Sequence, residues 1–464
     1  MKTDLLVIGG GPAGHVAAIK AVEYGKKAIV IEKYKLGGTC LHQGCIPTKT
    51  LLHTTELYDE LKHCEQIGLH VENAFVDLQG LQRRKNEIID NITSGVSSLV
   101  EKKGVDVVYG LAELISLNRA KVTLSDGSEE YIDFDNLILA TGSEPFMLNI
   151  PGADLPSVIT SNEALSFTEL PKKLVIVGGG VIGVEFAQML NRLGVKVSII
   201  EAYHKLLPHM DNELTQQLTD ILRSEGIDIY LNAVVESFES HKEDTMVYFK
   251  QDGIRKALDA STILMAVGRK PNTNHLNLES LGIELERGAI KVNRFMQTNI
   301  PHIYAVGDCT GGFMLAHVGF EQAVIAAKNI TSGNQEQFDG KTVPACVYTK
   351  PEFACVGLSE EKARHMFDNI KVGTASLAGN AKTVIGQQTG YVKFVVDGDS
   401  SEVLGLHILG PRASDMIHEG ALALKMNAKI EDILETIHGH PTVAEGVHEA
   451  AQDIFKNAIY KLYD

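Results

Sequence analysis

Apolar residues in the first half of the chain form short continuous runs that end at glycines or at an acidic residue. The two clearest pairs of runs lie at residues 3–8 and 27–32, and at residues 174–177 and 195–201. Runs of this length, bounded by turn residues and separated by helical stretches such as residues 14–24, predict the strands of βαβ units. The pattern therefore predicts an α/β fold.

The pattern changes from about residue 337 onward. Apolar segments there read as strands, and the amphipathic segments that follow them read as helices. We expect strands within residues 343–357, 391–397 and 403–410, and helices at residues 414–426 and 443–463. Strands followed by helices are typical of an α+β unit.

Motif order divides the chain into three expected domains. Residues 1–145 and a return segment, residues 266–336, form a first dinucleotide-binding domain that is interrupted by helical patterning at about residues 50–105. Residues 146–265 form a second dinucleotide-binding domain, and residues 337–464 form the C-terminal domain. The expected fold class is α/β, with two Rossmann-like dinucleotide-binding domains plus a C-terminal α+β domain.

The first βαβ unit carries a glycine motif at its strand-to-helix turn. The glycines are Gly9, Gly11 and Gly14, and Glu32 ends the next strand eighteen residues after the last of them. Glycines at this spacing let a pyrophosphate approach the helix N-terminus, and the carboxylate accepts hydrogen bonds from a ribose. This context predicts a dinucleotide site.

The same motif occurs a second time, as Gly178, Gly180 and Gly183 with Glu201. A single site with a decayed duplicate is disfavoured, because both copies keep all three glycines and the acid. A carboxylate at Glu201 suits a free 2′-hydroxyl and repels a 2′-phosphate, and Ala202 and Tyr203 supply no arginine for such a phosphate. The second site therefore favours NAD over NADP.

Two cysteines follow the first βαβ unit in the run GGTCLHQGCIPTK, residues 37–49. Cys40 and Cys45 are separated by four residues, and the preceding glycines allow a tight turn into a helix whose positive end favours thiolates. Two structural cysteines or half of a metal site are the alternatives. Metal-ligand pairs are usually closer in sequence, and no second cluster follows. The pair predicts a redox disulfide and no metal site.

Further motifs extend over nearly the whole chain. They are ATG at residues 140–142, AVGRKPN at 266–272, YAVGDC at 304–309, LAHVG at 315–319 and HGHPTVAE at 438–445. In this order they resemble the pyridine nucleotide–disulfide oxidoreductase family, and within it the dihydrolipoamide dehydrogenase branch. The resemblance implies tightly bound, non-covalent FAD at the first site, NAD at the second, and a C-terminal domain that forms a homodimer.

The resemblance also assigns roles to residues. Lys49 would lie near the flavin and pair with Glu185, and Asp308 would bind the ribityl chain. The expected contacts to FAD are Gly9, Gly11, Gly14, Glu32, Lys49, Ala112, Thr141, Gly142, Asp308 and Ala316. The expected contacts to NAD are Gly178, Gly180, Gly183, Glu185, Glu201, Val234 and Gly268.

The chemistry also needs a base, and the chain has 17 histidines. We expect His440, because Pro441 suits the first turn of a helix that would bring Glu445 back to the imidazole. His438 and His448 are close competitors, but the family's His-Pro-Thr-x-x-Glu pattern fits His440 alone. By resemblance, this base serves the active site of the other subunit.

The implied reaction is oxidation of protein-bound dihydrolipoamide with reduction of NAD, in 2-oxoacid dehydrogenase or glycine-cleavage complexes. The partners would be lipoyl domains of acyltransferases or of glycine-cleavage carrier proteins. The alternatives are an NADH-dependent reductase of another disulfide and a non-catalytic scaffold that keeps FAD for stability. Intact Cys40, Cys45 and His440 disfavour the scaffold.

Net charge limits the partners further. The chain carries a formal charge of −16, so nucleic acid and anionic membrane surfaces are unfavourable partners. No segment is apolar enough to span a bilayer, and a strand begins directly at the N-terminus, so we expect a cytoplasmic protein. The remaining cysteines, Cys64, Cys309, Cys346 and Cys355, show no framework spacing and are expected to be reduced.

Overall fold

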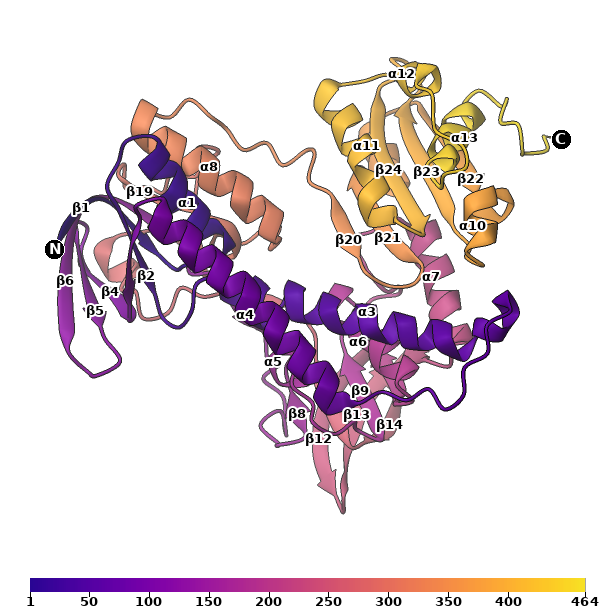
Figure 1. Ribbon diagram of the computed structural model, residues 1–464, viewed down its shortest axis with the longest axis horizontal. Coiled ribbons are helices and arrows are strands. Elements are labelled where there is room, and N and C mark those ends of the chain that lie inside the picture. The colour runs from indigo at the N-terminus through magenta and orange to yellow at the C-terminus, as the bar shows by residue number, and fades with distance from the viewer. Residues whose placement is uncertain (464) are drawn as a thin grey trace.

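The computed structural model describes residues 1–463, which form three lobes around a central region (Figure 1). Two lobes are built on Rossmann-type sheets, mixed in the first lobe and parallel in the second, and the third lobe combines an antiparallel sheet with helices. The expected fold class is confirmed.

The first lobe contains a seven-stranded sheet of order β3-β2-β1-β6-β5-β4, with β19 also paired to β6. Its strands are β1 (Lys2–Ile8), β2 (Ala28–Glu32), β3 (Asp106–Tyr109), β4 (Leu111–Ser116), β5 (Arg119–Thr123), β6 (Glu129–Leu139) and β19 (Ile303–Ala305). Helices α1 (Pro12–Glu23) and α8 (Ala316–Ser332) pack against each other on this sheet (Figure 1). Because β19 pairs in parallel with β6, the chain returns to the first sheet after leaving it.

A helical segment lies between β2 and β3 of the first lobe and packs against the second lobe. It comprises α2 (Gly38–Gln43), α3 (Cys45–Lys62), the short helix η1 (Cys64–Ile67) and α4 (Leu78–Lys102). The helical patterning at residues 50–105 is thus confirmed. Helix α3 packs against both α4 and α6 (Val181–Arg192), so the segment that begins with the two cysteines spans both nucleotide lobes.

The second lobe has a five-stranded parallel sheet of order β11-β10-β9-β15-β8 and a three-stranded antiparallel sheet of β12, β13 and β14. The strands are β8 (Val158–Ile159), β9 (Lys173–Val177), β10 (Lys196–Ile200), β11 (Asp228–Tyr230), β12 (Ala233–His241), β13 (Asp244–Gln251), β14 (Ile254–Ala260) and β15 (Thr262–Met265). Its other helices are α5 (Ser161–Ala164) and α7 (Asn212–Ser224).

Between these lobes, β7 (Ser143–Pro145) and β16 (Arg269–Pro271) pair as an antiparallel ribbon. The chain leaves the first lobe through β7 and returns through β16. Between β16 and α8 lie β17 (Leu285–Glu286), β18 (Ala289–Ile290) and the short helices η2 (Glu279–Leu281) and η3 (Gly307–Thr310).

The third lobe is an antiparallel sheet of order β20-β21-β24-β23-β22, covered by helices. The strands are β20 (Ala345–Val347), β21 (Glu352–Gly357), β22 (Ile370–Ser376), β23 (Tyr391–Asp397) and β24 (Val403–Gly410). The helices are α9 (Glu360–Met366), η4 (Leu377–Gly379), α10 (Ala381–Ile385), α11 (Ala413–Met426), α12 (Ile430–Glu435) and α13 (Glu445–Asp453).

The single helix expected over residues 443–463 is wrong in its extent, because α13 ends at Asp453. The Asp453 carboxylate accepts hydrogen bonds from Lys461 Nζ and from the Tyr463 hydroxyl, at 2.6 and 2.8 Å. The chain therefore folds back on the last residue of the helix, and Lys456 adopts a left-handed conformation with φ of 55° in the turn.

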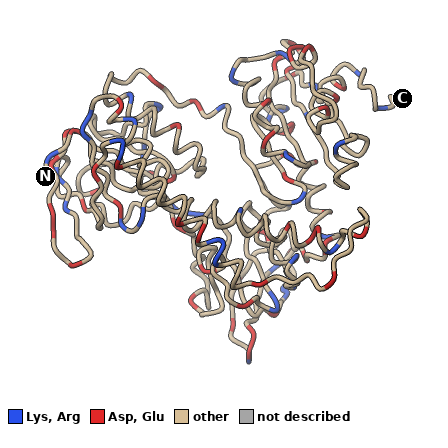
Figure 2. Tube along the Cα trace, viewed as in Figure 1, with Lys and Arg blue, Asp and Glu red and all other residues tan. Residues whose placement is uncertain are grey.

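Within residues 1–463, no helix combines the length and the apolar character needed to cross a membrane. Positions of positively and negatively charged residues are spread along the chain in all three lobes (Figure 2).

Candidate active site

One large cavity of about 2310 Å³ lies between the lobes and joins both glycine motifs to the two cysteines. Most of the residues expected to act at a site line it: Gly9, Gly11, Glu32, Cys40, Cys45, Lys49, Ala112, Thr141, Gly142, Gly178, Gly180, Glu185, Glu201, Val234, Gly268, Asp308 and Ala316. Gly14 and Gly183 are buried in the turns behind its wall. His440 and Glu445 do not line it.

The first glycine turn is built by close approach of backbone to backbone. Gly9 has φ of 103°, which L side chains rarely adopt, and a Cβ at Gly14 would lie 1.7 Å from the Gly9 carbonyl oxygen. Helix α1 begins behind this turn with Gly11 as its N-cap and no side-chain cap. Its free N–H groups therefore face the cavity, as a bound phosphate requires.

The second turn repeats this arrangement. Gly178 has φ of 111°, and a Cβ at Gly183 would lie 2.0 Å from the Gly178 carbonyl oxygen. Helix α6 also begins without a side-chain cap, at Gly180. The backbone thus provides two phosphate-sized cradles in one cavity, which fits two dinucleotides.

Each acidic residue holds its own turn. Glu32 accepts hydrogen bonds from Gly10 N at 2.7 Å and from Tyr34 N at 2.8 Å. Glu201 accepts equivalent bonds from Gly179 N at 2.5 Å and from Tyr203 N at 2.8 Å. Both carboxylates line the cavity, so they are fixed in place where a ribose would lie.

The two cysteines lie on consecutive helices, the short α2 and the longer α3. Gly37 and Gly38, with φ of 105° and 55°, turn the chain into α2, which carries Cys40, and α3 then begins at Cys45. Both are free thiols. Cys45 is exposed to the cavity and takes the helix start that favours a thiolate.

The pKa values of the two thiols are shifted in opposite directions. A hydrogen bond from the Cys40 thiol lowers the pKa of Cys45 to about 7 in spite of burial, and the Lys49 ammonium lowers it further. The same hydrogen bond, together with burial, raises the pKa of Cys40. Cys45 is therefore the thiolate of the pair near neutral pH.

Lys49 and Glu185 form the expected ion pair across the two nucleotide lobes. Lys49 Nζ lies 2.9 and 2.8 Å from the two carboxylate oxygens of Glu185. The Glu185 side chain is 3% exposed and the Lys49 side chain 33% exposed. The pair joins α3 to α6 near the start of α3, where Cys45 lies.

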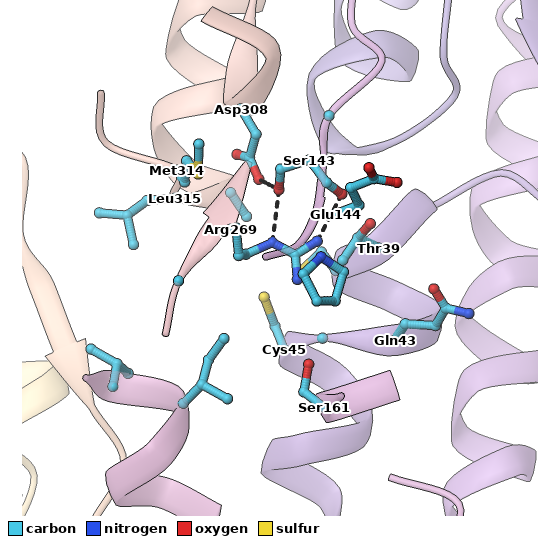
Figure 3. A pocket seen from close by; sticks show the side chains of 18 of the residues that line it. Thr39, Gln43, Cys45, Ser143, Glu144, Ser161, Arg269, Asp308, Met314 and Leu315 are labelled. Atoms are coloured by element: carbon cyan, nitrogen blue, oxygen red, sulfur yellow. Dashed lines mark hydrogen bonds between the residues drawn. The ribbon is translucent and has the colours of Figure 1, made fainter. Parts of the chain in front are cut away.

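A hydrogen-bonded chain of Arg269, Ser143 and Asp308, which was not predicted from the sequence, lies in the cavity with Cys45 (Figure 3). Arg269 donates to the Ser143 hydroxyl and to the Ser143 carbonyl, both at 2.7 Å. The Ser143 hydroxyl in turn donates to Asp308 Oδ2 at 2.5 Å. Burial lowers the pKa of Arg269. The AVGRKPN motif could have indicated this chain, because it contains Arg269, but Gly268 was its only residue predicted to lie at a site.

His440 and Glu445 meet as expected, although not through the expected helix turn. His440 Nδ1 lies 2.8 Å from Glu445 Oε1, and Thr442 N donates to Glu445 Oε2 at 2.9 Å. Burial raises the pKa of Glu445, but the hydrogen bonds from His440 and Thr442 outweigh this effect, so the pKa is lowered overall. Pro441 was expected in the first turn of a helix, and this is wrong: α13 begins only at Glu445, after the intervening turn.

The competing histidines have other partners. His438 Nε2 lies 3.0 Å from Glu419 Oε1, and the ring is only 8% exposed. The ring of His448 packs against that of His438, with centroids 5.2 Å apart. In contrast, the His440 side chain is 73% exposed, and it points to no thiol of its own chain.

The other four cysteines are free thiols, as expected. Burial raises the pKa of Cys309 and of Cys346 to about 11, and that of Cys355 to about 12. These three thiols therefore stay protonated near neutral pH.

The sequence of this chain matches models of a known protein family. The family described as "Pyridine nucleotide-disulphide oxidoreductase" matches residues 3–323, and its dimerisation domain matches residues 343–451. The chain belongs to the pyridine nucleotide–disulphide oxidoreductase family. It is an enzyme of the flavoprotein disulfide oxidoreductase type, a class that uses FAD and a pyridine nucleotide, and it carries the dimerisation domain of homodimers.

Relatives within the family match nearly end to end. A dihydrolipoyl dehydrogenase of Bacillus subtilis is 38% identical over 459 residues, which is 97% of either chain. A dihydrolipoamide dehydrogenase of Chaetomium thermophilum is 39% identical and covers 98% of this chain and 92% of its own. Among solved structures, the Cu(II) complex of the HOCl-induced flavoprotein disulfide reductase RclA from Escherichia coli is similar, with a TM-score of 0.88 and 30% identity, over 97% of this chain and 99% of that one.

Proposed function

We propose that this enzyme oxidises protein-bound dihydrolipoamide and reduces NAD, with FAD held at the first glycine turn. The observation that carries the proposal is the pair of free thiols, Cys45 with a pKa of about 7, in a cavity that joins two uncapped helix N-termini. The similarity to dihydrolipoyl dehydrogenases over 97% of the chain supports this substrate. Residues 1–145 with 266–336 would hold FAD, residues 146–265 NAD, and residues 337–464 would form the dimer.

The thiol chemistry follows from the positions of the two sulfurs. In the oxidised enzyme, a substrate thiolate attacks Cys40 and breaks its bond to Cys45, which leaves as the thiolate. The second substrate thiol then displaces Cys40, so the substrate becomes a disulfide and both cysteines are reduced. FAD, when bound, supplies the two-electron acceptor between the thiols and the nicotinamide.

The other residues hold this chemistry in place. His440, oriented by Glu445, takes the proton of the substrate thiol. Lys49 keeps a positive charge beside Cys45, and Glu185 holds Lys49. Glu201 selects NAD through the ribose 2′-hydroxyl, as Glu32 binds the ribose of FAD at the first turn.

Two substitutions test the thiol assignment. Partial reduction of the flavin-loaded enzyme should give a long-wavelength charge-transfer band from the Cys45 thiolate. Cys45→Ser should abolish it, whereas Cys40→Ser should show the band without added substrate. A band that survives in Cys45→Ser would assign the sulfurs the other way round.

Substrate preference separates the proposal from its alternative, an NADH-dependent reductase of another disulfide. The purified enzyme should oxidise a dihydrolipoyl domain with NAD at a kcat/KM at least about tenfold above that for reduction of glutathione disulfide or cystine with NADH, a difference of about 1.4 kcal/mol. The reverse ranking would favour the alternative.

The proposed role of His440 as the base would involve a second subunit, since within one chain His440 does not line the thiol cavity. His440→Gln should lower dihydrolipoamide oxidation by about 10²–10⁴-fold and keep NADH-dependent reduction of artificial acceptors. Mixing His440→Gln chains with Cys45→Ser chains, under conditions of exchange, should restore about a quarter of the activity per total subunit. No recovery, with exchange demonstrated, would place His440 at its own chain's site or outside catalysis.

A further inference from the structure

Tyr348 of the third lobe contacts both members of the Lys49–Glu185 ion pair. It follows β20 directly, and its backbone N–H donates to Glu185 Oε1 at 3.0 Å. Its ring centroid lies 4.5 Å from Lys49 Nζ. Backbone and side chain of one residue thus hold the two partners of the pair separately.

The ring, and not the hydroxyl, makes the contact with Lys49. The face of an aromatic ring is negative and attracts an ammonium within about 6 Å of its centroid. Within residues 1–463 the Tyr348 hydroxyl has no hydrogen-bond partner, and burial raises the pKa of Tyr348 to about 12, so the side chain stays neutral. A phenylalanine could therefore replace it at this contact.

The ring adds a second contact to a lysine that is only partly buried. Glu185 holds the ammonium from α6, but a third of the Lys49 side chain remains exposed, and lysine has a long, flexible stem. Tyr348 lines the same cavity as Cys45 and Lys49. A ring face at this place keeps the ammonium beside the thiol and away from the open cavity.

We infer that Tyr348 is a positioning residue for the thiol site: its ring fixes the Lys49 ammonium beside Cys45, and so couples the dimerisation lobe to the redox pair. The inference rests on the proposed function, in which Cys45 acts as the thiolate. It adds a role for the third lobe that does not depend on His440.

The test measures the acidity of Cys45 and not turnover. In flavin-loaded Cys40→Ser protein, the charge-transfer band reports the Cys45 thiolate directly and can be titrated with pH. Tyr348→Leu in this background should raise the midpoint by about half a pH unit, the equivalent of a cation–π contact. Tyr348→Phe should restore most of the shift, because it keeps the ring face.

A second ion–ring pair on the same helix supplies a matched control. Lys62 Nζ lies 4.3 Å from the Tyr58 ring centroid, at the far end of α3 from the thiols. Tyr58→Leu removes an equivalent contact and should leave the midpoint unchanged. If Tyr348→Leu does not retain flavin, Tyr348→Met removes the ring with an unbranched apolar side chain and gives the same comparison.

The outcomes separate the two proposals. An unchanged midpoint in the flavin-loaded leucine or methionine variant would overturn the inference alone. An equal shift in Tyr58→Leu would also overturn it, because the effect would then be general to the helix. Absence of any band in the Cys40→Ser parent would overturn the proposed function, and this inference with it.

Discussion

The two glycine turns are nearly identical in their local geometry and differ in what surrounds them. Both have a first glycine with φ above 100°, a third glycine packed on the first, and a glutamate that accepts two backbone N–H groups. Beyond Glu32, however, the chain enters α2 and α3 and presents Cys40 and Cys45. The local sequence therefore determines the turn, whereas the segment that follows it carries the two thiols at the first turn only.

The second turn is anchored differently. Beyond Glu201, the chain reaches Asp211, which caps α7 and pairs with Lys393 of β23 in the third lobe, at 3.2 Å. The Lys393 side chain is almost completely buried. The segment after the first turn thus carries the two thiols, whereas the segment after the second turn carries a buried ion pair with the third lobe.

Matched glycine substitutions should separate the two turns most strongly. In Gly14→Ala, a methyl group would meet the Gly9 carbonyl, so the first cradle should open and the protein should lose FAD and all activity. In Gly183→Ala, the second cradle should open, and flavin absorbance and the charge-transfer band should remain while the KM for NAD rises more than about tenfold. Absorbance spectra and steady-state kinetics provide the measurement.

The control for this pair is Gly95→Ala. Gly95 lies in helix α4, and among residues 1–463 an added Cβ would meet no atom within 4 Å apart from its chain neighbours and the backbone of its own helix. This variant should keep both nucleotides and gain about 0.5–1 kcal/mol of helix stability. Loss of flavin in both motif variants would show that the turns are not independent.

The turns and the contacts within motifs could be predicted from the sequence because each depends on residues close in the chain. Glu32 lies near the glycines that it holds, and Glu445 lies five residues from His440. The position of Lys49 opposite Glu185 could not be derived in this way, since 136 residues separate them, and it came from the family resemblance.

Contacts that depend on packing between lobes were not predictable. The Arg269–Ser143–Asp308 chain forms because β7 and β16 pair where the chain crosses between lobes, and no local pattern specifies that ribbon. The end of α13 was missed because the sequence continues with helix-forming residues, and a tertiary contact of Asp453 with Lys461 decides otherwise.

A change in nucleotide preference should have a smaller effect than the glycine substitutions, and it should arise at the second turn only. Ala202 is exposed on the cavity wall, so Ala202→Arg adds a charge for a 2′-phosphate and leaves the hydrogen bonds of Glu201 intact. Combined with Glu201→Gln, which removes the repelling carboxylate, it should narrow the NAD-over-NADP ratio of kcat/KM by about 10–100-fold, for about 1–3 kcal/mol. An unchanged ratio would mean that this turn does not bind the adenosine ribose.

The smallest effect concerns the pH dependence of the Cys45 thiolate. Only the first turn is followed by a thiol that titrates near neutral pH, so this effect belongs to the first turn alone. The charge-transfer band requires the Cys45 thiolate, so it should be present above a midpoint near pH 7 and disappear as the pH falls through that value. The Cys40 thiol is the largest cause of the low pKa, as it donates a hydrogen bond to the thiolate. Cys40→Ser keeps a donor and should hold the midpoint near that of the two-electron-reduced enzyme. Cys40→Ala has no donor and should raise the midpoint by about 1–2 pH units, because a hydrogen bond to a charged group is worth about 1.5–3 kcal/mol. Equal midpoints in the serine and alanine variants would contradict this role of Cys40 and leave the helix start and Lys49 to account for the acidity of Cys45. As a control, the dissociation constant for NAD, measured over the same pH range, should show no such midpoint.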